Sequence, residues 1–332
     1  MSKRLGRPLV AALMVATIGV AGSWCRQAPE SEPEPSTIGI QEEHEQRKAG
    51  LVLQFSDDFS KEYGPPDYFD LTRWTRLGTG QARIENGYWL LDVLRPHQLA
   101  VGGFATTERV FNPGLSGTNG VEITVAGFSH EGDHSEFRTF ETEKAGQLRL
   151  VQAWSLTIGN RQGPTGGKAD EEKDRGVQLH FDLILPSGLY VYLVRDLVPG
   201  DFDNYPRDGY VPGGPTDLSE RERRQLHEDA VEQGGAFVTF DCVALASRVY
   251  RSEQEINQIL GSSRRWGLYL TDDANTVYWT LDGQVMDTSD VSGYFSSSPE
   301  SVRDGAFLSV MGVGLFERNT WEMDDLEIYV SP

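Results

Sequence analysis

Short runs of alternating or continuous apolar residues recur from residue 51 onward, separated by clusters of turn-forming residues. Turn chemistry is clear at Glu85-Asn86-Gly87 and at Asp282-Gly283. Strands with one buried face alternate in this way, so the chain is predicted to be all-β, a two-sheet antiparallel β-sandwich or jelly roll. The expected strands cover residues 51–55, 82–94, 121–128, 148–158, 177–185, 189–197, 236–246, 265–270, 277–281, 307–313 and 321–330.

Two short helices are expected to interrupt the strands. Ser219 and Glu222 have the spacing of a capping box, and the helix that they open would end near Gly234. Ser252 and Glu255 have the same spacing, before a helix that would end near Gly261.

The N-terminus has the layout of a secretory signal. Basic residues lie within the first seven positions, and residues 9–22 are apolar and uncharged. This stretch is shorter than the ~20 residues that a membrane span needs. Residues 1–24 are therefore expected to be a signal peptide, which makes the protein extracytoplasmic, either secreted or tethered to the cell surface; an uncleaved anchor is the alternative.

Cys25 stands where a bacterial lipoprotein carries its lipidated cysteine. Residues 21–25 resemble a lipobox, but Trp24 takes a position that is normally small. Lipidation of Cys25 is one hypothesis, and it is the only membrane contact expected; cleavage after Ser23 is the other. The second cysteine, Cys242, lies in an apolar run where a lone cysteine is usually a core residue, and a Cys25–Cys242 disulfide stays open.

Residues 25–50 are rich in Glu, Pro, Ser and Gln and contain no aromatic residue. Such a segment buries too little apolar surface to fold, so it is expected to be a disordered tether before a single domain at 51–332. The formal net charge of −20 makes nucleic acid an unexpected partner, because an acidic surface repels phosphate. Arg264-Arg265 is expected to be an exposed, solvated pair. A monomer is expected, and self-association stays open.

The ends of the folded region carry a family resemblance. Residues 55–59 read FSDDF and 85–90 read ENGYWL, while 277–283 read VYWTLDG and 323–329 read MDDLEIY. These motifs, in this order, resemble the concanavalin A-like lectin/glucanase superfamily, and both ends are similar to family 16 glycoside hydrolases. The resemblance implies a sandwich that hosts lectins, hydrolases and lyases, so it does not fix a function. It also implies a structural Ca²⁺ at Asp324 and the backbone of Gly87, with no organic cofactor expected.

Those hydrolases use two carboxylates about 5–5.5 Å apart. The sequence has one formal match to their motif, Glu322, Asp324 and Glu327, but it falls on the expected closing strand. In a regular strand Glu327 would point away from the other two, and only a bulge would bring all three together. A standard family 16 hydrolase is therefore not expected.

The strand at 177–185 places Gln178, His180 and Asp182 on the face opposite its apolar residues. Gln178-Leu179-His180 resembles a motif of family 7 alginate lyases, whose companion motifs have no counterpart here. An ordinary polar face, sugar binding, and catalysis by His180 and Asp182 all stay open. Trp154, two residues after Gln152, could stack on a sugar ring or belong to the core.

These observations rank three hypotheses. The first is a carbohydrate-recognising protein that binds glycan through Trp154, Gln178, His180 and Asp182. The second is a glycan-cleaving enzyme, a lyase or hydrolase, on the same sheet face; whether the chain is an enzyme stays open. The third is a non-catalytic adhesion module of the cell envelope.

Overall fold

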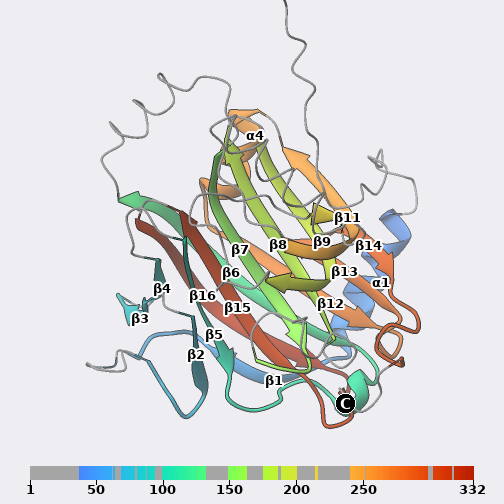
Figure 1. Ribbon diagram of the computed structural model, residues 1–332. Coiled ribbons are helices and arrows are strands. Elements are labelled where there is room, and N and C mark those ends of the chain that lie inside the picture. Colours follow the sequence, from blue (N-terminus) through green and yellow to red (C-terminus); the bar gives the residue numbers. More distant parts are fainter. Residues whose placement is uncertain are drawn as a thin grey trace, which may run out of the picture.

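The computed structural model describes most of the chain from residue 37 to the C-terminus (Figure 1). The described residues are 37–61, 63, 69–78, 81–86, 88–93, 99–131, 149–162, 175–185, 188–199, 214–215, 240–250, 252–297, 302–315 and 318–332. The proposed signal peptide, Cys25 and the predicted helix at 219–234 lie outside them. Within this part of the chain, no helix combines the length and the apolar character needed to cross a membrane.

The first of two sheets, sheet A, has eight strands. Its path runs β14, β13, β12, β6, β16, β4 and β3, and β1 also pairs with β16. The bounds are β14 Gln284–Asp290, β13 Thr276–Leu281, β12 Arg264–Thr271, β6 Asn119–Glu131, β16 Arg318–Val330, β4 Tyr88–Val93, β3 Gln81–Glu85 and β1 Val52–Asp57.

The second sheet, sheet B, also has eight strands, in the order β10, β11, β9, β8, β7, β15, β5 and β2. All its pairings are antiparallel except the short β10–β11 contact. The bounds are β10 Gly214–Pro215, β11 Phe240–Tyr250, β9 Gly188–Pro199, β8 Gly176–Leu185, β7 Arg149–Gly159, β15 Phe307–Leu315, β5 Leu99–Thr106 and β2 Trp74–Gly78.

The core lies between the two sheets and is rich in tryptophan. Trp154 of sheet B packs against Trp266 and Trp321 of sheet A, with ring centroids 6.2 and 6.3 Å apart. Phe104 of sheet B stacks on Trp89 of sheet A. Side chains that face this core define the inner face of each sheet, and those that alternate with them define the outer face. Six tryptophans are fully buried in it, namely Trp74, Trp89, Trp154, Trp266, Trp279 and Trp321.

The predicted fold class, a two-sheet antiparallel β-sandwich, is confirmed. The segment predicted as one strand at 82–94 is instead the hairpin of β3 and β4, which turns at Asn86 with φ of 56°. Strands β2, β5, β10 and β14 have no counterpart among the expected strands. The predicted capping box is present at α4 (Glu253–Leu260): Ser252 Oγ accepts from Glu255 N–H, and the Glu255 carboxylate accepts from Ser252 N–H.

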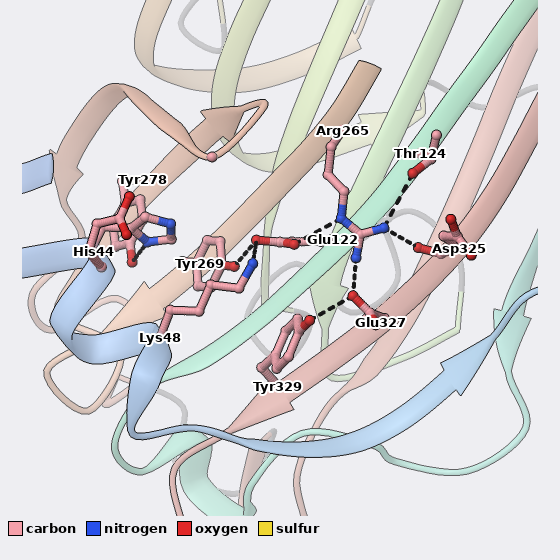
Figure 2. A network of polar contacts seen from close by, with 12 residues as sticks. His44, Lys48, Glu122, Thr124, Arg265, Tyr269, Tyr278, Asp325, Glu327 and Tyr329 are labelled. Carbon is pink, nitrogen blue, oxygen red and sulfur yellow. Dashed lines mark hydrogen bonds and ion pairs between the residues drawn. The ribbon is translucent and has the colours of Figure 1, made fainter. Parts of the chain in front are cut away.

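The predicted tether is wrong for its second half. Residues Thr37–Ala49 form a helix, α1, which lies on the outer face of sheet A (Figures 1 and 2). Composition does not reveal this helix, because α1 docks through polar side chains and not through an apolar stripe. The folded domain therefore includes Thr37 and the rest of α1, which precede the predicted boundary at residue 51. A short 3₁₀ turn, Pro113–Leu115, precedes β6.

Candidate functional site

Six polar or aromatic side chains form a patch on the outer face of sheet B, here called the sheet B patch. All are almost completely buried, with exposed fractions from 0% to 5%. Strand alternation places them opposite the core residues Leu156, Leu179 and Val310 of the same strands. The members are Ser155, Thr157, Gln178, His180, Tyr192 and Ser309.

Register arranges the patch in two cross-strand rows. Thr157 on β7 lies directly opposite Gln178 on β8, and Ser309 on β15 lies opposite Thr157. In the second row His180 lies between Ser155 on β7 and Tyr192 on β9. Directly opposed residues have Cβ atoms about 4.5–5.5 Å apart, so each row places its polar groups side by side.

Gln178 is the most constrained member of the patch. Its side chain is 0% exposed, and neither its amide oxygen nor its amide nitrogen has a hydrogen-bond partner among the described residues. The hydroxyl of Thr157, directly opposite, is in the same state. Leaving a buried polar group unsatisfied costs about 1–3 kcal/mol, so such groups in a stable fold normally bind water or a ligand.

His180 lies on the same face as Gln178, as predicted from the alternation. Its imidazole stacks on the ring of Tyr192, with centroids 6.3 Å apart and planes at 29°. Asp182 follows in register, opposite Ala153 and Tyr190, but its side chain lies outside the part of the chain that is described. This polar row is covered and does not face solvent, because Gln178 and His180 are both buried.

Trp154 does not belong to this patch. It is 0% exposed on the inner face of sheet B, where it packs against Phe181, Trp266 and Trp321. The expected role of Trp154 as a platform for a sugar ring is corrected: the residue is core, the alternative that the sequence also allowed. Trp154 and Gln178 project from opposite faces of the same sheet.

A second polar assembly lies on the outer face of sheet A, and Figure 2 shows it in close view. This sheet A cluster consists of Glu122, Arg265, Tyr269, Glu327 and Tyr329. The Arg265 guanidinium donates to Glu122 at 2.9 Å and to Glu327, while the Tyr269 hydroxyl donates to Glu122 and the Tyr329 hydroxyl donates to Glu327 at 2.6 Å. Arg265 is therefore not the solvated cation that the sequence predicted.

Helix α1 completes the sheet A cluster. Lys48 Nζ donates to Glu122 at 2.6 Å, and His44 Nδ1 lies 2.9 Å from the Tyr278 hydroxyl (Figure 2). Burial alone would raise the pKa of Glu122, but hydrogen bonds from Lys48, Tyr269 and Arg265 outweigh burial and lower it. At the other end of the contact, the Gln41 amide donates to Gly283 O at 2.9 Å and accepts from Val285 N–H at 2.7 Å.

Two glycines make room for the Tyr269 ring. A Cβ on Gly120 would lie 2.3 Å from ring atoms of Tyr269, and one on Gly267 would lie 2.3 Å from Thr280 Oγ1 and 3.0 Å from the Tyr269 ring. The ring therefore lies flat over glycine backbone, where its hydroxyl reaches Glu122. The saturated hydrogen bonding of this cluster is typical of a structural network.

The formal catalytic trio lies on the same outer face. β16 has a register shift between Asp324 and Glu327, with Asp325 at φ of 45°, so the bulge that the sequence argument required is present. Glu327, however, is bound by Arg265 and Tyr329. This pairing suits a structural carboxylate better than a nucleophile.

The predicted calcium site combines Asp324 with the backbone of Gly87. Asp324 is half-buried; burial raises its pKa, and the negative charges of Asp325 and Asp58 raise it further. That setting suits a cation, but the described residues contain no group of three or more His, Cys, Asp or Glu side chains arranged to hold a metal. Gly87 lies outside those residues. Calcium at Asp324 and Gly87 stays a prediction.

No protein-family model matches the chain, and no curated protein matches its sequence. Among solved structures it resembles the carbohydrate recognition domain of Emp46p, with 13% identity and a TM-score of 0.41 over 80% of this chain and 94% of that one. It also resembles an endo-1,3-beta-glucanase from Streptomyces sioyaensis, with 10% identity and a TM-score of 0.45 over 86% and 98%. A third similar structure is the catalytic domain of a laminarinase from Thermotoga petrophila, with 12% identity and a TM-score of 0.45 over 84% of this chain and 97% of that one.

By their descriptions these neighbours are one carbohydrate recognition domain and two glucanases. The assignment of the fold rests on the two sheets described above. What the neighbours bind or cleave is a property of those proteins.

Proposed function

We propose that this chain is a carbohydrate-recognising protein and that its ligand is bound at the sheet B patch. The observation that supports this is the Gln178 amide, which is buried and without a partner among the described residues, directly opposite a Thr157 hydroxyl in the same state. A sugar hydroxyl both donates and accepts, so it can satisfy an amide and a hydroxyl at once.

The chemistry of the patch favours a neutral sugar. Its six members supply hydroxyls, one amide, one imidazole and one phenol, with no carboxylate or ammonium group among them. The net charge of −20 also disfavours a polyanionic glycan. Because the patch is buried, binding requires that it first become accessible, and the ligand then replaces the missing hydrogen bonds.

The test is a double substitution that keeps shape and removes polarity. Gln178→Leu together with Thr157→Val should abolish binding to an array of neutral glycans, while the circular dichroism spectrum stays that of the wild type. Gln54→Ala, at an exposed position on β1 of the other sheet, is the control and should bind as the wild type does. Unchanged glycan binding by the double variant would contradict the assignment of the site.

A second candidate function is glycan cleavage on the same face, favoured by the stacked pair of His180 and Tyr192. An imidazole can accept a proton near neutral pH, and a phenol beside it can donate one. This function predicts new reducing ends or unsaturated products from a polysaccharide, lost in His180→Ala. If the protein binds glycan but does not cleave it, the first function is supported. If a broad screen finds no binding and no cleavage, a non-catalytic envelope module is favoured.

Export belongs to the same proposal, because a glycan-binding protein meets polysaccharides outside the cytoplasm. Expression of the full chain in a bacterial host should yield a processed form that has lost residues 1–24. If Cys25 is the lipidated residue, the processed form incorporates labelled fatty acid and the Cys25→Ser variant does not. An unlabelled processed form that begins at Trp24 would place cleavage after Ser23 instead.

A further inference from the structure

Helix α1 is held on sheet A mainly through polar side chains, and one of them is a histidine. Among positions 41–49, His44 is the one buried residue, with 3% exposed. Gln41, His44 and Lys48 recur at helical spacing and all face the sheet. The geometry therefore places a titratable imidazole at the centre of the contact between helix and sheet.

The imidazole lies in a pocket made by two tyrosines. Tyr269 and Tyr278 stack on each other with ring centroids 5.1 Å apart, and the edge of each packs against His44 at 5.0 and 5.5 Å (Figure 2). Both tyrosines are themselves buried, and the Tyr278 hydroxyl makes the hydrogen bond to Nδ1. This is a place for a neutral ring, because an aromatic enclosure replaces the water that an imidazolium needs.

The charges around His44 would stabilise a protonated, positively charged imidazole only weakly. From α1 itself come Glu45 and the repelling Lys48, and from β6 comes Glu122. The Glu122 carboxylate is already taken up by Lys48, by Tyr269 and by Arg265 from β12. One turn away on the helix, Arg47 is paired with Glu43 and with Asp272 of the β12–β13 turn.

We propose that α1 is an acid-released clasp: a proton on the His44 imidazole detaches the helix from the outer face of sheet A, while the sandwich beneath stays folded. Release uncovers the stacked Tyr269–Tyr278 pair and the Glu122 carboxylate, which α1 covers in the docked state. The inference is independent of the sheet B patch, since it concerns the opposite side of the sandwich.

The direction of the pH effect follows from burial. Desolvation is the largest influence on His44 and lowers its pKa below the ordinary 6.5, against the attraction of Glu122 and Glu45. The undocked helix therefore binds a proton more readily than the docked helix. Docking is strongest above pH 6.5 and weakens as pH falls below that value.

Between pH 7.5 and 5, the titration of His44 can be followed without a change in the charge of its buried neighbours. Glu122 and Asp272 have pKa values lowered by their hydrogen bonds to cations, so they stay ionised throughout it. Burial raises the pKa values of Tyr269 and Tyr278, so these stay neutral. Of the groups buried between α1 and sheet A, namely His44, Glu122, Tyr269 and Tyr278, His44 is the one whose charge changes in this range.

Amide hydrogen exchange of the intact protein tests the clasp. From pH 7.5 to 5.0 the opening equilibrium of α1, corrected for intrinsic exchange, should rise by up to about 30-fold, the limit for a docked imidazole that takes up no proton. Amides of β7 and β8 should keep their protection. In His44→Gln, which keeps a polar group for Tyr278 but does not titrate, α1 protection should not change with pH. In His180→Gln, which alters the buried histidine of the other sheet, the α1 response should stay as in the wild type.

Equal α1 protection at both pH values in the wild type would overturn the clasp, as would a pH response that persists in His44→Gln. If His44→Gln fails to dock α1 even at pH 7.5, the wild-type His44 resonance followed by NMR decides. Its titration midpoint must coincide with the loss of α1 protection, and a separate midpoint would contradict the proposal.

Discussion

Thr157 and Gln178 lie directly opposite each other on β7 and β8, and their buried polar atoms have no hydrogen-bond partner among the described residues. The wild-type fold carries the cost of these unsatisfied groups, so Gln178→Leu should raise the free energy of unfolding by about 1–3 kcal/mol in the absence of ligand. Chemical denaturation measures this change.

Gln162→Leu is the matched control, because the Gln162 amide donates to Thr106 O at 2.8 Å and to Thr75 Oγ1. Its loss should lower the free energy of unfolding by about 0.5–1.5 kcal/mol. If Gln178→Leu is destabilising as well, ordered water already satisfies the amide and the ligand argument loses its support.

Substitutions of Trp154 distinguish a role in the core from a role in ligand binding. Trp154→Ala should cost about 3–5 kcal/mol of unfolding free energy, because it empties a large volume among Phe181, Trp266 and Trp321. Trp154→Phe keeps an aromatic ring there, and its folded fraction should bind glycan with wild-type affinity. Normal stability with lost binding in Trp154→Phe would restore the stacking role that the sequence suggested.

Glu122 should be the most stabilising carboxylate of the sheet A cluster. Its side chain is 3% exposed and is bound to Lys48, Arg265 and Tyr269. Glu122→Gln leaves two cations facing a neutral amide and should cost about 3–5 kcal/mol by thermal or chemical unfolding. Glu327→Gln, at a position 34% exposed, should cost roughly 0–1 kcal/mol.

The effect of Glu122 should also depend on pH in a defined direction. Its folded-state pKa lies below the ordinary 4.5, so its contribution is fully present above that value and is lost as pH falls through the folded-state pKa. The difference in unfolding free energy between wild type and Glu122→Gln should therefore shrink as pH falls below about 4.5. A constant difference down to pH 3 would contradict this account.

Gly120 should not tolerate a side chain. A Cβ there would lie 2.3 Å from the Tyr269 ring and would force the ring away from Glu122, at a cost of about 1–3 kcal/mol. Gly50→Ala is the control, since its Cβ would meet only Arg47 O at 3.5 Å. Differential scanning calorimetry should show a lowered Tm for Gly120→Ala and a nearly unchanged one for Gly50→Ala.

Sequence patterns predicted the strands that bury one complete face. The alternation at 177–185 gave both the inner row, Leu179 and Phe181, and the outer row, Gln178 and His180. It could not give the burial of the outer row, because strand periodicity reports which face a residue occupies and not whether that face is covered.

Other elements had no signal of this kind. Helix α1 packs through Gln41, His44 and Lys48, so its spacing is helical but its residues are polar, and a hydrophobic pattern does not reveal it. Strand β14 also has few apolar residues, so it shows no hydrophobic alternation either. Glu122 was invisible because its partners Lys48 and Arg265 are far away in the sequence and meet only across paired strands and a docked helix.

The contact of Gln41 with β14 has a consequence for how molecules meet one another. β14 ends the strand path of sheet A, and Gln41 occupies Gly283 O and Val285 N–H as the peptide group of one more strand would. Unpaired groups at such a border are templates for strand addition by another chain. The first turns of α1 thus protect the edge of sheet A against pairing with a further strand. A molecule in which α1 is not docked would expose that edge to strand addition by neighbouring molecules.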